Sequence, residues 1–259
     1  MSALGDGFSW LFDSANWWGP GGLVTRIGEH LAYSAAALAV AFVVAFPIGL
    51  VIGHTGRGRF SASASANLLR AIPTYGVVSL LFIWKPLTLW PLLLALAVLA
   101  LPPIMLNTAG GIANVDPQTR DAATGVGLTG TQVLARVEVP NALPLILAGV
   151  RSAANQVIAT AAILGVKGQG GLGVFIFSGY STQRYNIVSG ASIAIVALVL
   201  IVEGLFAVLQ RRLISPGLRI AATGNSRRRR KMSSLVINQP VGPATELVST
   251  DSASRGRNP

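Results

Sequence analysis

The longest run without charge constrains this chain more than any other feature. From Leu31 to Gly53 the sequence has no Asp, Glu, Lys, Arg or His. As a helix this run would be about 34 Å long, enough to cross the hydrocarbon core of a bilayer. The whole chain is 52% hydrophobic and 11% charged, whereas an ordinary soluble domain has roughly 25% charged residues. These features exclude a soluble globule and predict an all-α integral membrane protein.

Further apolar runs predict the other membrane spans. The candidates are Pro86–Val115, Ala71–Trp84, Ala142–Val166 and Tyr185–Val202, which can extend to Gln210. Arg151 interrupts the run from Ala142, and Ala71–Trp84 is so short that its length alone also permits a re-entrant segment. With Leu31–Gly53, these runs predict up to five transmembrane helices.

The positions of Lys and Arg set the orientation, because these residues accumulate on the cytoplasmic side of membrane proteins. If Ala71–Trp84 did not cross, the loop with Arg120 would change sides and both termini would share one side. Five spans with the N-terminus outside and the C-terminus inside therefore fit the charges better. The outer side then receives Arg26, Lys85, Lys167 and Arg184, and the inner side receives Arg57, Arg59, Arg70, Arg120, Arg136 and ten basic residues from Arg211 to Arg257.

The two ends of the chain differ in composition, with the membrane domain expected at residues 30–214. Residues 1–29 are rich in aromatic side chains, and acidic residues precede any basic one. We expect an amphipathic segment at the outer interface rather than a signal peptide. Residues 215–259 are polar and include the basic run Arg227–Lys231. We expect a disordered cytoplasmic tail attracted to anionic lipid, and not nucleic-acid binding, because no aromatic stacking residue accompanies the arginines.

The inner loop, residues 112–141, contains the signals of a helix. Asp116 followed by Pro117 is a good N-cap before a proline at the first helical position. Gly125 and Gly127 are expected to end this helix.

A second short helix is predicted after the glycines. Thr129 and Gln132 have the spacing of a capping box, and Pro140 marks the far end of the helix. One face of the helix is apolar and is formed by Val133, Leu134 and Val137. An apolar ridge exposed on the cytoplasmic side favours a docked partner over a simple connection.

The residues of this loop resemble the signature of ABC-importer permeases. Asp121-Ala122-Ala123, three residues, Gly127, nine residues and Val137-Glu138-Val139-Pro140 match the spacing Glu-Ala-Ala, three residues, Gly, nine residues, Ile-x-Leu-Pro. Asp121 replaces the usual Glu and Val139 the usual Leu, so charge and apolarity are kept. Further motifs are similar to those of osmoprotectant permeases of the ProW-like group, across roughly Gly28–Pro216: Glu29-His30-Leu31, Pro47-Ile48-Gly49, Ala71-Ile72-Pro73-Thr74, Asn107-Thr108-Ala109-Gly110-Gly111, Leu147–Ala153 and Gly168–Gly173. Lys167 and Gln169 depart from the small residues usual there.

This resemblance implies a type I ABC importer permease fold, MetI-like, in a bacterial inner membrane. It implies a non-catalytic subunit with a second permease, the same or homologous, two cytoplasmic ATPases and an extracytoplasmic solute-binding protein as partners. No cofactor is expected on this chain, and ATP and Mg belong to the partner ATPase. The implied solute is of the glycine betaine, choline, carnitine or proline type. The residues implied in ATPase coupling are Asp121, Ala122, Ala123, Gly127, Val133, Leu134, Val137 and Pro140. Of these, Val133, Leu134 and Val137 would contact the ATPase or the underside of the permease itself.

Arg151 and Glu203 are ionisable residues inside predicted spans, where such groups are costly and face the bundle interior or water. Their depths along their helices match, and Arg151, Asn155 and Gln156 give the predicted span Ala142–Val166 a polar side. We favour a structural ion pair over direct contact with solute, and both interpretations stay open. A solute carboxylate would be a suitable partner for the arginine.

Several other functions are disfavoured. The chain has no cysteine, which excludes disulfides, thiolate metal sites and cysteine nucleophiles. Gly168, Gly170 and Gly173 match G-x-G-x-x-G only by chance, since they follow a membrane helix. There is no P-loop motif, and the two histidines lie on opposite sides, so neither ATP hydrolysis nor a metal site is expected. The alternatives to an osmoprotectant permease are an intramembrane enzyme, a passive channel or anchor, and a permease for an amino acid or sulfonate. Gly49 and Gly53 form a G-x-x-x-G that ordinary helix packing explains equally well.

Overall fold

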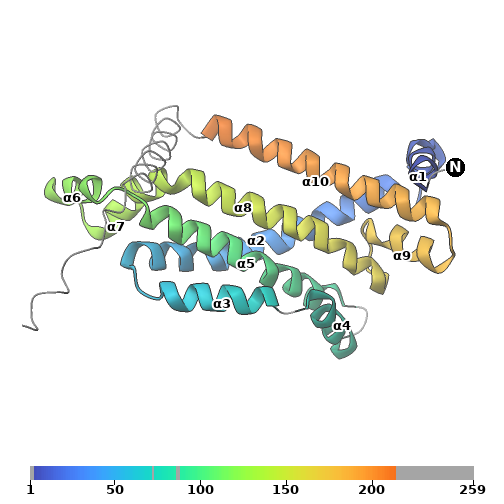
Figure 1. Cartoon of the computed structure of the whole chain (residues 1–259), viewed down its shortest axis with the longest axis horizontal. Coiled ribbons are helices and arrows are strands. Elements are labelled where there is room, and N and C mark those ends of the chain that lie inside the picture. The colour runs from blue at the N-terminus through green and yellow to red at the C-terminus, as the bar shows by residue number, and fades with distance from the viewer. Residues whose placement is uncertain (1–2, 72, 86–87, 214–259) are drawn as a thin grey trace, which may run out of the picture. The chain divides into compact units, whose positions relative to one another are not determined.

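Every regular element in the described part of the chain is helical (Figure 1). The computed structural model describes residues 3–71, 73–85 and 88–213. The predicted tail over residues 215–259 lies outside them. The elements are α1 (Ala3–Phe12), η1 (Ser14–Asn16), α2 (Leu23–Thr55), α3 (Arg59–Ala71), α4 (Thr74–Trp84), α5 (Leu89–Ala113), α6 (Pro117–Gly125), α7 (Gly130–Val133), η2 (Leu134–Glu138), α8 (Val139–Ala161), η3 (Ala162–Lys167), α9 (Gly173–Ser181) and α10 (Tyr185–Leu213).

Four helices of the described part are long and apolar enough to cross a membrane: α2, α5, the stretch Gly130–Val166 and α10. They confirm four of the predicted spans. The first span is longer than expected, because α2 extends beyond Leu31–Gly53 at both ends. The structure thus supports a multi-pass membrane protein.

The predicted second span, Ala71–Trp84, is not a single helix. Its helical part, α4, has 11 residues and is about 16 Å long, too short to cross alone. A helix that the sequence analysis did not anticipate, α3, precedes it, and the two are bent by 76°. Pro73, directly before α4, lacks the N–H that a continuous helix would use, which explains the break. The described part therefore has four spans, or five if this bent pair is one.

The predicted short helix before Pro140 was also wrong in length. The helix that starts at Gly130 continues through Pro140 to Val166. Pro140 lies in the first turn of α8, directly after the π-helical turn η2. A wider turn changes the hydrogen-bond pattern where proline has no N–H to donate, so the helix passes the proline without ending.

The middle of the bundle is formed by α5, which packs between α2 and α8. A Cβ atom on Gly49 would lie 2.8 Å from the Met105 carbonyl oxygen, and one on Gly53 would lie 2.8 Å from the Ala109 carbonyl oxygen. On the other side, a Cβ on Gly149 would lie 2.7 Å from a backbone oxygen of α5. Small residues let helix backbones approach closely. The G-x-x-x-G pair therefore serves packing within this chain.

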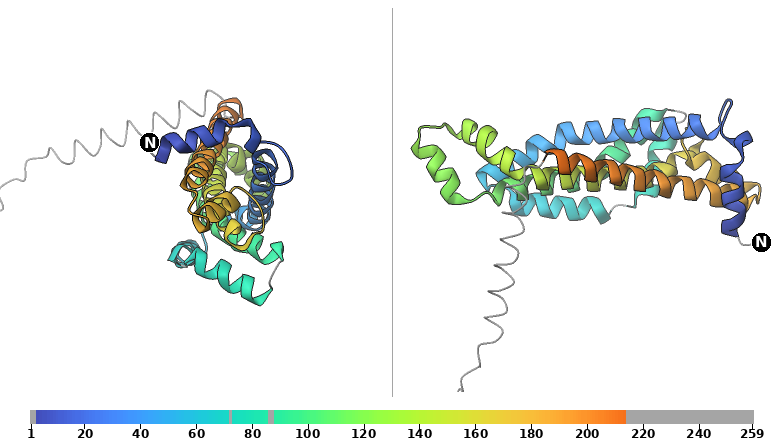
Figure 2. Two further views of the ribbon diagram at one scale, coloured as in Figure 1. Left: turned by 90° about the vertical axis from the view of Figure 1, so that its right-hand side faces the viewer. Right: turned by 90° about the horizontal axis from the view of Figure 1, so that it is seen from above.

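The helical bundle has two ends that are formed by different elements (Figures 1 and 2). The α6 end comprises α6 and α7, toward which the C-terminal ends of α2, α5 and α10 point. The α1 end comprises α1, α9 and the beginnings of α2 and α10.

At the α1 end, the N-terminal segment is held by packing against α10. Trp10 is buried in an apolar cluster with Leu23, Leu172 and Ile195. A Cβ atom on Gly7 would lie 2.6 Å from the Cβ of Ser189, so α1 and α10 approach closely. Aromatic side chains on the other side of the segment, Phe8, Phe12 and Trp18, are exposed. The predicted interfacial segment is thus also an integral part of the helical bundle.

Candidate functional site

Both helices between α5 and α8 begin where the sequence predicts. Asp116 caps α6, and its carboxylate accepts a hydrogen bond from the Gln118 N–H at 2.9 Å. At α7, Thr129 and Gln132 form a capping box in which the Thr129 N–H donates to the Gln132 Oε1 at 2.9 Å. Both predicted helix starts are therefore confirmed.

A glycine turn joins these two helices. Gly127 has a φ of +91°, which side chains with a Cβ rarely adopt. Its N–H donates to the Thr124 carbonyl oxygen at 2.9 Å, and the Leu128 N–H donates to that of Ala123 at 3.2 Å. The glycine is therefore required by backbone geometry, as in a helix C-cap.

The residues predicted to couple to a partner divide into a buried and an exposed set. Ala123 and Val133 are buried, and Leu134 packs on the cluster of Ile112, Ala142 and Ile146 beneath the loop. Val137 is half-buried. The second helix therefore turns much of its apolar face toward the rest of the helical bundle. The exposed members are Asp121, Ala122, Gly127 and Pro140.

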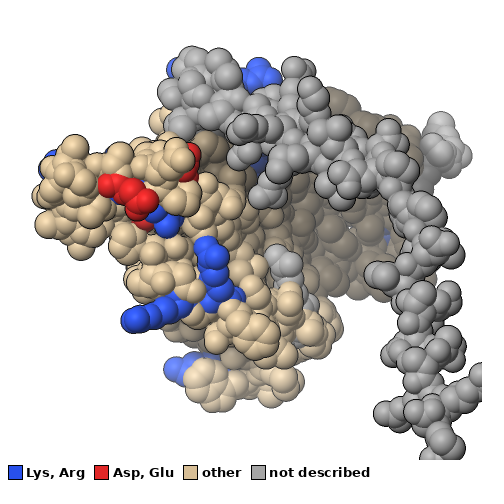
Figure 3. All heavy atoms as spheres, turned by 60° about the vertical axis from the view of Figure 1, so that its left-hand side comes forward, with Lys and Arg blue, Asp and Glu red and all other residues tan. Residues whose placement is uncertain are grey.

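Another residue supplies the apolar surface at the tip of the loop. Val126, which the sequence analysis did not single out, is 80% exposed. It lies between the exposed glycines at 125 and 127. Figure 3 turns this end of the molecule toward the viewer and shows acidic and basic side chains gathered on it. Val126 is therefore the large apolar side chain that this turn offers to solvent.

Three further residues under the loop were missed by sequence reasoning. The buried carboxylate of Glu138 lies 2.7 Å from His54 Nδ1 and 2.9 Å from Arg120 Nε. The only signal in the sequence is one acid between Val137 and Val139. Its partners are distant in the chain, and nothing local identifies them.

Within the spans, the structure brings Arg151 and Glu203 together. A guanidinium nitrogen of Arg151 contacts the Glu203 carboxylate, and the Asn155 amide donates to the same carboxylate at 2.6 Å. Arg151 also donates to the Gln210 side-chain oxygen at 3.2 Å. Gln156 follows Asn155 in α8 and is half-buried, but it does not take part in these contacts.

This charged cluster is open on one side. The side chains of Arg151 and Glu203 are 31% and 33% exposed. Charged groups at membrane depth face protein or water rather than lipid. This side of α8 and α10 is therefore suited to line an aqueous path or a contact with another subunit.

At the α1 end, two motifs that are far apart in the sequence meet. Glu29 accepts a hydrogen bond from the Gly171 N–H at 2.8 Å and another from Arg26 at 2.9 Å. His30 is fully buried; its Nδ1 accepts from the Leu172 N–H at 3.3 Å, and its Nε2 lies 2.8 Å from the Ile158 carbonyl oxygen. A neutral imidazole with its hydrogen on Nε2 satisfies both partners. The glycine-rich turn is thus fastened to the start of α2.

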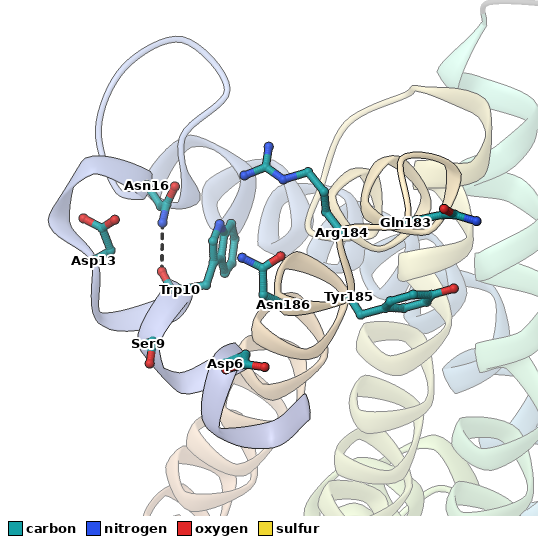
Figure 4. Close-up of a pocket in the computed structure, with 9 residues that line it drawn as sticks. All are labelled: Asp6, Ser9, Trp10, Asp13, Asn16, Gln183, Arg184, Tyr185 and Asn186. Atoms are coloured by element: carbon teal, nitrogen blue, oxygen red, sulfur yellow. Dashed lines mark hydrogen bonds between the residues drawn. The ribbon is translucent and has the colours of Figure 1, made fainter. Parts of the chain in front are cut away.

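An open hollow of about 750 Å³ lies at the same end, between α1 and the turn from α9 to α10 (Figure 4). The Asn16 amide donates to the Trp10 carbonyl oxygen at 2.9 Å on one side of it. The hollow is lined mainly by polar and charged side chains, from Asp6, Ser9, Trp10, Asp13, Asn16, Gln183, Arg184, Tyr185 and Asn186.

Known proteins are similar to this chain in sequence and in fold. The chain is 31% identical over 202 residues to the carnitine transport permease protein OpuCB of Listeria monocytogenes, covering 78% of this chain and 93% of the relative. It is 30% identical over 219 residues to the osmoprotectant import permease protein OsmW of Salmonella typhimurium, covering 83% and 100%.

A solved structure of the MetNI methionine ABC transporter, in an inward-facing conformation, has a chain with the same fold. The TM-score is 0.65 at 21% identity, and the match covers 74% of this chain and 96% of that one. Residues 45–215, which include the α6–α7 loop, Arg151 and Glu203, match one family description. The chain belongs to the family of binding-protein-dependent transport system inner membrane components.

Proposed function

We propose that this chain is the permease subunit of an ATP-driven importer for a small osmoprotectant of the glycine betaine, choline, carnitine or proline type. The observation that carries the proposal is the α6–α7 loop: two capped helices joined at Gly127, with Val126 exposed at the tip. A simple connection between spans needs neither caps nor an exposed apolar tip. The names of the relatives support the solute class.

The proposed topology has five spans, with the bent pair α3 and α4 counted as one. The α6 end then lies in the cytoplasm and the α1 end outside. The support is the charge distribution, since Arg57, Arg59, Arg120, Arg136, Arg211 and Arg212 belong to the α6 end. In this proposal the basic run Arg227–Lys231, which lies outside the described residues, would be attracted to anionic lipid.

ATP and Mg belong, in this proposal, to cytoplasmic ATPase subunits that contact the loop. Asp121, Ala122 and Val126 would form the contact, and closure of the ATPases would move the loop as a rigid body. ATP binding biases the transport path only if such contacts differ between the two states. The extracytoplasmic binding protein would dock at the α1 end, where the polar hollow offers a suitable surface.

The transport path is proposed to run along the polar side of α8 and α10, facing a second permease subunit that is a copy or a homologue. The open charged cluster of Arg151, Asn155 and Glu203 supports this placement, because it requires a polar neighbour at membrane depth. Gln156 would lie at the edge of that surface.

The test is uptake in vesicles that contain this chain, its ATPase and its binding protein. Labelled glycine betaine, carnitine, choline and proline are compared with methionine and taurine. We expect ATP-dependent accumulation of at least one of the first four. Uptake that needs no ATP would indicate a channel, and accumulation of methionine or taurine alone would indicate an amino acid or sulfonate permease.

A further inference from the structure

Glu138 is a buried charge that the proposed transport path does not use. Its side chain is 1% exposed, and it is the one carboxylate among the buried residues of the described part. One oxygen lies 2.7 Å from His54 Nδ1 and the other lies 2.9 Å from Arg120 Nε. Burying a carboxylate demands such partners, because the group loses its hydration.

The partners of Glu138 come from separate helices. His54 is in the last turn of α2, Arg120 is in α6, and Glu138 ends the turn η2 that leads into α8. Arg120 also donates to the carbonyl oxygen of Ile112, near the end of α5. Four helix ends therefore meet around a single carboxylate.

Stability alone does not explain a charge at this position. A buried ion pair is often no more stabilising than well-packed apolar side chains of similar volume. Val139, the residue after Glu138, packs together with Leu134 against an apolar cluster of Ile112, Ala142 and Ile146. A buried apolar residue at position 138 would avoid the loss of hydration, so we look for another use of the carboxylate in its contacts with His54 and Arg120.

We propose that Glu138 is a positioning residue that makes α6 move together with α2 and α8 when the ATPase acts on the loop. This inference rests on the proposed function. Without these contacts, α6 connects to α8 only along the chain, through the turn at Gly127 and the short helix α7. The contacts of Glu138 bypass this turn and give the physical connection that coupling between distant sites requires.

The experiment uses the half-exposed partner His54, because changes there leave the buried carboxylate in place. His54→Leu removes the contact to Glu138, whereas His54→Asn keeps a donor where Nδ1 was. In vesicles with the ATPase and the binding protein, we expect His54→Leu to lower the solute moved per ATP hydrolysed about tenfold. His54→Asn should stay within about twofold of wild type. Arg136→Gln, exposed on the same turn η2, is the matched control and should also stay within about twofold.

A second measurement does not depend on transport. Amide hydrogen exchange in α6 of the full chain in lipid nanodiscs should be about tenfold faster in His54→Leu and in Glu138→Gln, and unchanged in His54→Asn.

Three results would overturn the proposal. The first is unchanged amide exchange in α6 of His54→Leu, and the second is an equal drop in solute moved per ATP hydrolysed in His54→Asn and His54→Leu. The third is a His54→Leu variant that assembles into fewer complexes, each of which moves a normal amount of solute per ATP. If the wild-type complex shows no solute-stimulated ATP hydrolysis, the proposed function fails, and the exchange data still decide whether Glu138 holds α6.

Discussion

Both ends of the molecule are fastened by an acidic residue and a histidine, but through different partners. At the α1 end, Glu29 and His30 accept hydrogen bonds from the backbone N–H groups of Gly171 and Leu172. At the α6 end, Glu138 meets the side chains of His54 and Arg120. The first arrangement holds a glycine-rich turn by its backbone N–H groups and joins α2 to the backbone of α8 at Ile158, whereas the second joins α2, α6 and η2 through contacts between side chains.

This difference separates two kinds of effect. A backbone contact holds a loop in the shape that folding requires, so its loss should appear mainly in stability. A contact between side chains of different helices transmits movement, so its loss should appear mainly in coupling. Variants at the α1 end should therefore change how much protein folds, and variants at the α6 end should change what the folded complex does.

The largest effect is expected for Gly173→Ala at the α1 end. A Cβ atom there would lie 1.8 Å from the Ala162 carbonyl oxygen, a distance that the backbone cannot accept without rearrangement. We expect loss of most of the folded protein, measured as monodisperse yield in detergent. Gly204→Ala on α10 is the control, because a Cβ there meets nothing within 4 Å, and alanine favours a helix by about 1 kcal/mol. Equal yields of the two variants would show that the α1 end is not tightly packed.

The next effect is expected for Gly127→Arg at the α6 end. The new side chain would project from the exposed tip, and solute-stimulated ATP hydrolysis should be abolished while the subunit still inserts. Part of the effect comes from the positive φ, which costs an ordinary residue about 1–2 kcal/mol. Gly127→Asn controls for this, because Asn tolerates that conformation better than most residues, and most of the stimulation should survive. Wild-type stimulation in Gly127→Arg would contradict docking at this tip.

The features predicted from the sequence are those whose signals are local. The caps at Asp116 and Thr129 and the turn at Gly127 need only a few neighbouring residues, and the long spans need only an uninterrupted apolar run. The pairing of Arg151 with Glu203 is the exception, because it follows from the matching depths of the two residues in their spans. Charged side chains inside a membrane are costly and pair with one another.

Other features depend on partners that are remote in the chain. Glu138 finds His54 at a separation of 84 residues, and Glu29 finds Gly171 at 142. Neither separation leaves a periodic pattern in the sequence. The bend between α3 and α4 and the continuation of the helix through Pro140 were missed because both depend on how neighbouring turns adapt to a proline.

A smaller effect is expected at the charged cluster, which lies between the two ends. Arg151→Met and Glu203→Gln should each lower thermal stability in detergent, because each leaves the other charge without its partner. Since both side chains are about one-third exposed, solvent screens part of each charge and the loss from each single change should be modest. The double variant should lose less than the sum of the two single variants. Additive losses, or a normally stable Arg151→Met with a raised transport constant, would favour solute contact over a structural pair.

The smallest effect is expected for Glu29→Gln, which tests the comparison most directly. The amide oxygen can still accept from the Gly171 N–H, but the charge that strengthens this bond and pairs with Arg26 is lost. We expect a loss of about 1 kcal/mol and a midpoint of thermal unfolding lower by about 2–4 °C. The solute moved per ATP hydrolysed should equal that of wild type in each folded complex, in contrast to the tenfold drop expected for His54→Leu. If Glu29→Gln uncoupled the complex as strongly as His54→Leu, the two ends would not differ in the way proposed, and the backbone contacts of the glycine-rich turn at Gly171 would be part of the transport cycle.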